Sequence, residues 1–312
     1  QIVTKSGIKN GIWSDLMNAF TFPMQLKKLP LLWLMIMPVA GAHAQLQMTY
    51  DIALNQVGFY PNGTKIAIVK GGAYQDFFVA TPDLSEKVFS SGLSESRQSI
   101  FSDKKTQVAD FSSLTRPGKF VLVVPGLGYS CTFEIRTHIF EDIARASLKA
   151  FYYQRFSVEL KEEFAGKWKR PFSHPDTKVL IHASAVGENR KEGTIISTPR
   201  GWIDAGDYNK YIVNSGITMG TLLSAYEDFP LFYQRQDLNI PESADAVPDI
   251  LDEIVWNLRW MMTMQDPGDG GVYHKCTNAG FDPMIMPHLA VTPRYVVQKG
   301  TAAALDFAAV TA

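Results

Sequence analysis

The sequence has few cysteines, no excess of charge of either sign and only one long hydrophobic run. Cys131 and Cys276 are its only cysteines, so a disulfide framework is excluded and at most one bridge can form. The 30 basic and 31 acidic side chains nearly cancel, and this balance indicates neither nucleic acid nor an anionic membrane as a partner. With 312 residues, 46% of them hydrophobic, the chain can bury a sizeable core and has room for two domains.

The hydrophobic run lies near the N-terminus and has the features of a secretory signal peptide. Lys27–Lys28 precede the apolar residues 29–40, and Ala42–Ala44 supply the small residues of a cleavage site. About a dozen apolar residues are too few to span a bilayer, which needs about 20. We therefore expect 24–44 to be a signal peptide, cleaved near its end, and the mature protein to be secreted. Residues 1–23 then belong to an over-extended reading frame or a cloning remnant.

Residues 45–138 have the pattern of a small β-sandwich. Short runs rich in β-branched and aromatic residues are separated by glycine, proline and asparagine turns. Several short strands over about ninety residues favour a sandwich. The domain could bind carbohydrate or support the segment that follows, and the lack of a recognisable aromatic cluster favours support. The runs are 65–69, 76–80, 106–111, 119–124 and 129–135.

Residues 139–312 have helical spacing of apolar side chains. In the clearest helix, Pro248 at the first position costs no hydrogen bond and Asp249 complements the helix dipole. Trp256 and Trp260 are four residues apart and extend its apolar stripe, so we expect them in the core and not as sugar platforms. The expected helices are 139–153, 211–226, 247–262 and 301–312.

The most informative run is Gly201–Tyr211, in a loop that leads into a helix. Asp204 and Asp207 lie three residues apart in it, among the aromatic residues Trp202, Tyr208 and Tyr211. Two carboxylates that lie this close repel each other where water is partly excluded, and proteins use such repulsion to tune the pKa of a base. The neighbouring aromatic faces are of the kind that stack on sugar rings. In the alternative interpretation, Asp204 caps a turn or helix and Asp207 is a first-turn acid favoured by the dipole.

Further motifs follow in order, at 247–253, 264–267 and 270–275. Together with 201–226 they resemble the family 9 glycoside hydrolases, and the resemblance extends over 51–312. It implies an N-terminal immunoglobulin-like β-sandwich followed by an (α/α)6 barrel. It also implies inverting hydrolysis of internal β-1,4-glucosidic bonds in cellulose, related β-glucans or cello-oligosaccharides.

The resemblance also implies the roles of individual residues. Inverting hydrolysis needs a carboxylate that deprotonates water and a carboxylic acid about 6.5 to 9.5 Å away that protonates the leaving oxygen. By resemblance Asp207 is the base, and Asp204 helps to hold the water. His274 matches a position that contacts the glucan, although a structural histidine bonded to loop backbone is an equal alternative. Tyr208 and Trp202 are the other expected substrate contacts.

The length of the second segment limits what the resemblance can supply. A barrel of twelve helices needs roughly 200 residues at least, and 139–312 is shorter. We therefore expect only the first part of the barrel. In the family the general acid is a glutamate near the C-terminal end of the barrel, and no residue here matches it. An exo-acting hydrolase of the same fold and an inactive, truncated sugar-binding fragment remain alternatives.

Relatives in the family hold a structural zinc with two cysteines and two histidines. His174 and His182 are present here, but Phe156 and Ser173 occupy what correspond to the cysteine positions. Two histidines do not make a closed tetrahedral site, so we predict no zinc.

Calcium is common in the family, which makes Asp245, Asp249 and Asp252 candidate ligands. Their spacing matches no recognised calcium loop, and charges at a helix N-terminus are the better interpretation. We assign no metal ligands, expect catalysis to need no cofactor, and expect a monomer.

Overall fold

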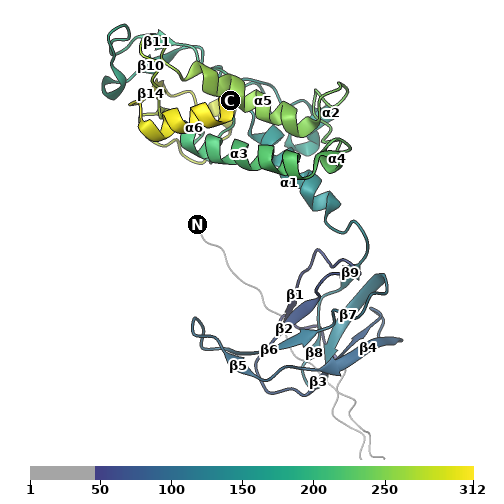
Figure 1. Ribbon diagram of the computed structural model, residues 1–312. Coiled ribbons are helices and arrows are strands. Elements are labelled where there is room, and N and C mark those ends of the chain that lie inside the picture. Colours follow the sequence, from purple (N-terminus) through teal and green to yellow (C-terminus); the bar gives the residue numbers. More distant parts are fainter. Residues whose placement is uncertain (1–45) are drawn as a thin grey trace, which may run out of the picture. The chain divides into compact units, whose positions relative to one another are not determined.

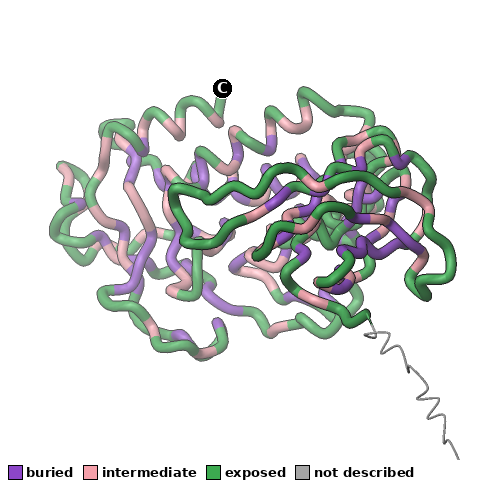
Figure 2. Tube along the Cα trace, turned by 90° about the horizontal axis from the view of Figure 1, so that it is seen from below, coloured by how far each residue is buried: buried purple, intermediate pink, exposed green. Residues whose placement is uncertain are grey.

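The computed structural model describes residues 46–312 (Figure 1), so the expected signal peptide lies outside the described residues. No helix in this part of the chain is long and apolar enough to cross a membrane. Buried and exposed residues follow one another along the described chain (Figure 2), and the β domain and the helical domain each have a hydrophobic core of their own.

The β domain consists of two sheets, as expected from its short runs. One has the strand order β1-β2-β6-β5, and the other has the order β4-β3-β7-β8, with β9 also paired to β7. In β2, Ala67 and Val69 are fully buried while Ile66 is exposed, because alternate side chains of a strand point to opposite faces. The strands are β1 (Ile52–Leu54), β2 (Ile66–Lys70), β3 (Asp76–Ala80), β4 (Lys87–Gly92), β5 (Arg97–Gln98), β6 (Lys105–Asp110), β7 (Gly118–Val124), β8 (Gly128–Tyr129) and β9 (Phe133–Ile135).

Four long helices confirm the helical pattern of the second domain. In α5, Asp249 and Asp252 lie in the first turn, and Pro248 is the N-cap, one residue before its expected place. Trp260 is fully buried, as expected, and Trp256 is partly buried against the same core. The helices are α1 (Glu141–Gln154), α2 (Glu162–Ala165), α3 (Ile212–Asp228), α4 (Pro230–Tyr233), α5 (Asp249–Thr263) and α6 (Thr301–Thr311), with 3-10 turns η1 (Gly166–Trp168), η2 (Ala183–Ala185) and η3 (Pro287–Leu289).

The helical domain also contains a small sheet that the sequence did not predict. Its order is β11-β10-β14-β13-β12, and only the β10/β14 pair is parallel. Strands this short show no periodicity, and the pairing joins segments far apart in the chain. The strands are β10 (Val179–Ile181), β11 (Ile195–Ile196), β12 (Lys210–Tyr211), β13 (Lys275–Asn278) and β14 (Arg294–Val296).

This sheet determines where the candidate catalytic residues lie. Strand β12 directly follows the Asp204–Asp207 loop and pairs with β13, which directly follows His274. Cys276 in β13 is buried, and both it and Cys131 are free thiols, so the one conceivable disulfide does not form.

Candidate active site

The Asp204 to Asp207 segment forms a tight loop before β12. The backbone N–H of Asp204 donates to the carbonyl of Asn209 at 2.9 Å, and that of Tyr208 donates to the carbonyl of Ala205 at 3.1 Å. Helix α3 begins only at Ile212, and no side chain caps it. Asp204 therefore does not cap α3, and Asp207 is not a first-turn acid of that helix. The helix-terminus part of the structural alternative is therefore wrong.

Three donors hold the half-buried carboxylate of Asp207. The hydroxyl of Tyr211 and the side-chain amide of Asn209 donate to its Oδ2 at 3.0 and 2.9 Å, and the backbone N–H of Asn209 donates to Oδ1 at 3.3 Å. Burial, together with the hydrogen bond to Asp207, raises the pKa of Tyr211, so the phenol stays protonated and donates. These contacts fix the direction of the Asp207 carboxylate.

Asp204 is exposed and has a different partner. Its Oδ1 accepts a hydrogen bond of 2.7 Å from the side-chain amide of Asn214 in α3. It lines a cavity of about 230 Å³ with Trp202, Tyr211 and Thr218, among others. The two carboxylates are thus held separately, one by the loop and Tyr211 and the other by the helix.

Trp202 lies mostly beneath this loop. Only 5% of the residue is exposed, and the ring packs on Phe151 with centroids 4.8 Å apart. Its indole N–H donates to Glu253 at 3.3 Å, and its backbone N–H donates to Asn257 at 3.0 Å. The indole therefore anchors the loop to α5, with little of its face left for a sugar ring.

Tyr208 is also engaged by the protein. Its hydroxyl donates to the carbonyl of Ile285, and its ring centroid lies 5.9 Å from that of Phe156 and 5.6 Å from that of His174. Tyr208 and Trp202, which were expected to contact the substrate, thus both hold the loop in place.

His274 is a neighbour of Tyr211, whose hydroxyl binds Asp207. The His274 and Tyr211 rings meet edge to face with centroids 6.5 Å apart. The backbone of His274 makes the fixing contacts, because its N–H donates to Gln298 at 2.9 Å and its carbonyl accepts from Ile212 at 3.0 Å. The structure therefore brings Tyr211 into contact with both Asp207 and His274.

The sequence interpretation included Tyr211 among the aromatic residues of the motif, but it missed several of the contacts described above. Asn209 and Tyr211 were in the motif, and their places two and four residues after Asp207 could have suggested that they reach its carboxylate. Asn257 and Glu253 in α5 left no such signal, because about fifty residues separate them from Trp202.

The residues at the zinc positions do not fit a zinc site. The Phe156 ring stacks on the His174 imidazole with centroids 4.0 Å apart and an interplanar angle of 6°. His182 instead accepts from the backbone N–H of Ser184 at 3.1 Å, and its ring meets the edge of Tyr295. An aromatic ring thus takes the space next to His174 that a thiolate ligand would need.

Two of the three calcium candidates, Asp249 and Asp245, accept from backbone N–H groups, whereas the buried Oδ2 of Asp252 has no hydrogen-bond partner within the described residues. Asp249 accepts from the N–H of Leu238 at 2.6 Å, and Asp245 accepts from that of Val247 at 2.7 Å. Within residues 46–312, no group of three or more histidine, cysteine, aspartate or glutamate side chains is placed to hold a metal ion.

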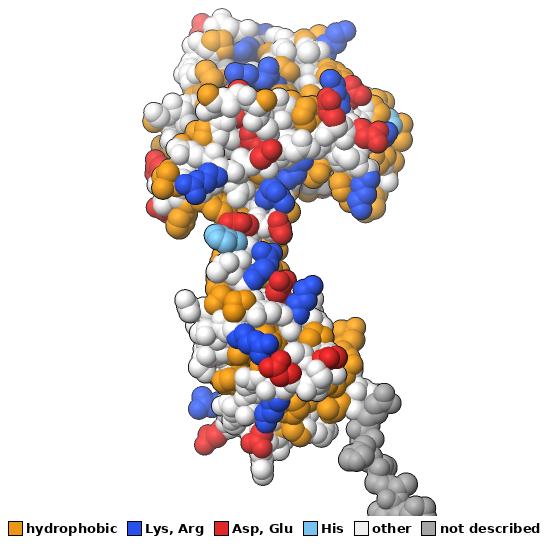
Figure 3. Space-filling view, turned by 90° about the vertical axis from the view of Figure 1, so that its right-hand side faces the viewer, with side chains coloured by type: hydrophobic (Ala, Val, Ile, Leu, Met, Phe, Trp, Pro, Cys, Tyr) orange, Lys and Arg blue, Asp and Glu red, His pale blue; other side chains and the backbone are white. Residues whose placement is uncertain are grey.

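On the face shown in Figure 3, basic and acidic side chains are interspersed.

Comparison with known proteins places both parts of the chain. A family model described as Glycosyl hydrolase family 9 matches residues 140–312, and one described as the cellulase N-terminal ig-like domain matches residues 47–129. A similar solved structure, described as Bacteroides ovatus GH9, has 48% identity and a TM-score of 0.80 and covers 85% of this chain and 48% of that one.

Curated relatives agree with these matches. The xyloglucan-specific endo-beta-1,4-glucanase BoGH9A of Bacteroides ovatus is 49% identical over 261 residues, which are 84% of this chain and 44% of that protein. Endoglucanase D of Acetivibrio thermocellus is 34% identical over 268 residues, which are 85% of this chain and 41% of that protein. The chain thus spans under half the length of these relatives.

Proposed function

The chain belongs to glycosyl hydrolase family 9, and from this premise we propose that its protein is an inverting endo-β-1,4-glucanase in which Asp207 is the general base. The observation that supports this role most directly is the set of three hydrogen bonds from Asn209 and Tyr211, which aim the Asp207 carboxylate. Preorganised donors of this kind hold a base in its reactive direction before substrate arrives.

In the proposed reaction, Asp207 removes a proton from a water molecule as the water attacks the anomeric carbon of the glucan. A carboxylic acid on the other side of the bond protonates the leaving oxygen. We assign that acid to no residue of this chain. We propose that Asp204 helps to hold the water, which its hydrogen bond from Asn214 of α3 supports. We also propose that His274 contacts the sugar, and its packing against Tyr211 supports this role.

We propose β-1,4-glucan backbones as substrates, with xyloglucan foremost, because a relative with 49% identity is named for xyloglucan specificity. Release of sugars only from chain ends is the alternative. The endoglucanase names of the curated relatives favour internal cleavage.

We further propose that the protein is secreted by means of residues 24–44, acts as a monomer and needs no cofactor for the reaction. The stacking of Phe156 on His174 supports the part of this proposal that concerns zinc.

The test uses the protein expressed from its complete reading frame, incubated with xyloglucan, unsubstituted soluble cellulose and cellohexaose. Internal cleavage predicts a rapid loss of viscosity, and inversion predicts that the α-anomer appears first by NMR. Asp207→Asn should lower kcat by about 10² to 10⁴ with KM nearly unchanged, the range for loss of a general base.

Asp204→Asn is the matched comparison, since it neutralises the other carboxylate of the same loop, and it should cost less. Turnover by Asp207→Asn at the rate of the unchanged protein, or initial formation of the β-anomer, would rule out the assignment.

A further inference from the structure

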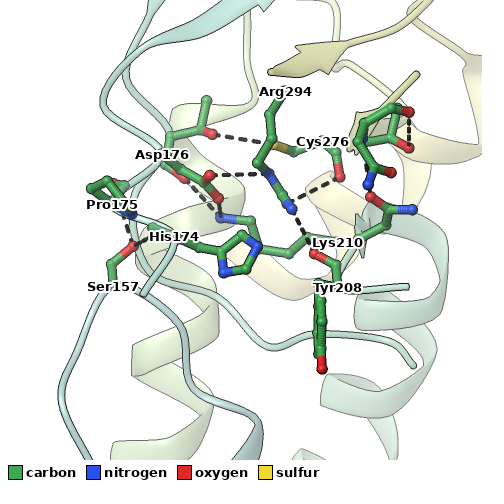
Figure 4. A network of polar contacts seen from close by, with 12 residues as sticks. Ser157, His174, Pro175, Asp176, Tyr208, Lys210, Cys276 and Arg294 are labelled. Atoms are coloured by element: carbon green, nitrogen blue, oxygen red, sulfur yellow. Dashed lines mark hydrogen bonds and ion pairs between the residues drawn. The ribbon is translucent and has the colours of Figure 1, made fainter. Parts of the chain in front are cut away.

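A buried ionic cluster lies at the base of the Asp204–Asp207 loop (Figure 4). Its members are Asp176, Lys210 and Arg294, and the side chains of all three are at least 92% buried. One oxygen of Asp176 lies 2.7 Å from Lys210 Nζ, and the other lies 3.0 Å from Arg294 Nε. The carboxylate thus bridges two cations, each of which also binds backbone of the loop or its flanks.

Lys210 closes the base of the loop. It is the first residue of β12, and its ammonium donates to the carbonyl of Arg200 at 2.7 Å and to that of Thr198 at 2.8 Å. Lys210 therefore connects the two ends of the segment that carries Asp204 and Asp207. Burial lowers the pKa of Lys210, and the charge of Asp176 opposes that effect.

Arg294 reaches the loop from β14. Its Nη1 donates to the carbonyl of Tyr208 at 2.7 Å. Tyr208 has φ +59°, in the left-handed region that non-glycine residues rarely adopt and that costs about 1 kcal/mol or more. The residue next to Asp207 thus keeps an unfavourable backbone conformation, and Arg294 binds it there.

The segment that presents Asp176 is itself held firmly. His174 and Asp176 both have positive φ, at +47° and +46°. The hydroxyl of Ser157 donates to the carbonyl of His174 at 2.7 Å. Because the backbone around Asp176 is held in this way, its carboxylate can bind both cations in fixed positions.

The cluster carries one more positive than negative charge. Although burial opposes its charge, Cys276, Asp176 and Asp207 contribute to raising the pKa of Arg294. Attraction between Arg294 and Asp207 therefore adds to the backbone contacts.

We propose that Asp176, Lys210 and Arg294 form a positioning unit that fixes the backbone on both sides of Asp207 and thereby the direction in which its carboxylate meets water. The unit touches no substrate and acts through Asp207, so this inference rests on the proposed function. A misplacement of about 1 Å at a reacting group can lower a rate by 10²-fold.

The first variant is Lys210→Met, which keeps the length of the side chain and leaves Asp176 paired with Arg294. It removes the ties to Arg200 and Thr198. We expect kcat on xyloglucan to fall by about 10-fold or more, with KM within about threefold, because binding does not depend on the direction of the base.

Lys65→Met is the matched control. Lys65 is likewise a fully buried lysine, but it lies in the β domain, where its ammonium donates to the carbonyls of Tyr60, Pro61 and Gly63. This variant should lose stability through the same kind of change, yet keep kcat within about twofold when both proteins are assayed well below their melting temperatures.

Arg294→Lys and Arg294→Met separate geometry from charge. A lysine cannot bind Asp176 and the Tyr208 carbonyl together as the guanidinium does, so in Arg294→Lys kcat should fall about 10- to 100-fold. The pH dependence of kcat/KM should stay unchanged, because the positive charge is kept. Loss of the charge in Arg294→Met should also move the acidic limb of the kcat/KM profile to higher pH, which a merely structural role would not do.

The inference fails if folded Lys210→Met and Arg294→Lys proteins keep kcat within twofold of the unchanged protein, or if they lose only affinity. A fall in kcat by Lys65→Met as large as that by Lys210→Met would also overturn it. If Asp207→Asn loses turnover while the cluster variants do not, only the positioning role is wrong. If Asp207→Asn keeps full turnover, the proposed base and the positioning role are both wrong.

Discussion

The hydroxyl of Tyr211 is one of three donors to Asp207 and can be removed alone. A hydrogen bond to a charged group is worth about 1.5 to 3 kcal/mol, so Tyr211→Phe should lower kcat by about 10- to 100-fold while KM changes little. Tyr226→Phe, in helix α3, which follows Tyr211 directly, changes a tyrosine that is partly buried in the core and is the control that should retain activity. Equal kcat values for the two variants would show that the Tyr211 hydroxyl does not support the base.

His174 is a second residue whose chemistry the fold changes. Burial, and next the positive charge of Arg294, lower its pKa from 6.5 to about 4. Between pH 6.5 and pH 4 the unfolded chain protonates this histidine, whereas the folded protein keeps it neutral. The stability that depends on a neutral His174 is therefore fully present above about pH 6.5 and is lost as the pH falls toward 4. The difference amounts to about 3 kcal/mol.

Urea unfolding at pH 7 and at pH 4.5 measures this effect. The unchanged protein should lose more stability between these pH values than His174→Asn, because asparagine does not titrate there and tolerates the positive φ of this position. Equal losses in the two proteins would show that His174 does not contribute to the acid sensitivity.

At the scale of elements, the close approach of α3 and α6 depends on one glycine. A Cβ on Gly216 would lie 2.7 Å from the Cβ of Asp306, which is closer than real contacts allow. Gly216→Ala should therefore push the two helices apart and cost about 1 to 3 kcal/mol in the free energy of unfolding.

Gly220 is the matched control on the same helix, because nothing lies within 4 Å of a Cβ added there. Gly220→Ala should stabilise the protein by about 0.5 to 1 kcal/mol, since alanine favours the helix. Chemical denaturation measures both, and effects of the same sign would contradict the packing argument.

The long helices and the main strands could be predicted from the sequence pattern, whereas the small sheet of the helical domain could not. The four long helices and the main strands of the β domain follow from apolar periodicity, and Trp260 lies in the core as its place on the stripe of α5 indicates. The sheet from β10 to β14 could not be predicted, because strands of two to four residues carry no pattern. Its pairing nevertheless brings His274 next to Tyr211.

At the scale of the whole molecule, the described chain has separate hydrophobic cores in its β and helical domains. Phe111 is fully buried in the β domain, with the rings of Phe59 and Phe133 both 5.3 Å away. Phe111→Ala should cost the β domain about 3 to 5 kcal/mol.

Hydrogen exchange followed by mass spectrometry localises this loss. Amides of β2 and β7 should exchange about a hundredfold faster or more in Phe111→Ala, while those of α5 should exchange at their former rate. Acceleration of α5 by the same factor would show that the two cores unfold as one unit.

The sequence by itself determined the family, the order of the two domains and the loop that carries Asp204 and Asp207, because these are encoded in local runs of residues. The tertiary structure decided what surrounds that loop. Arg294 binds the carbonyl of Tyr208 across 86 residues of chain. The sequence offers no local signal for such a pair, because only the pairing of β14 with β13, and of β13 with β12, brings Arg294 near the loop.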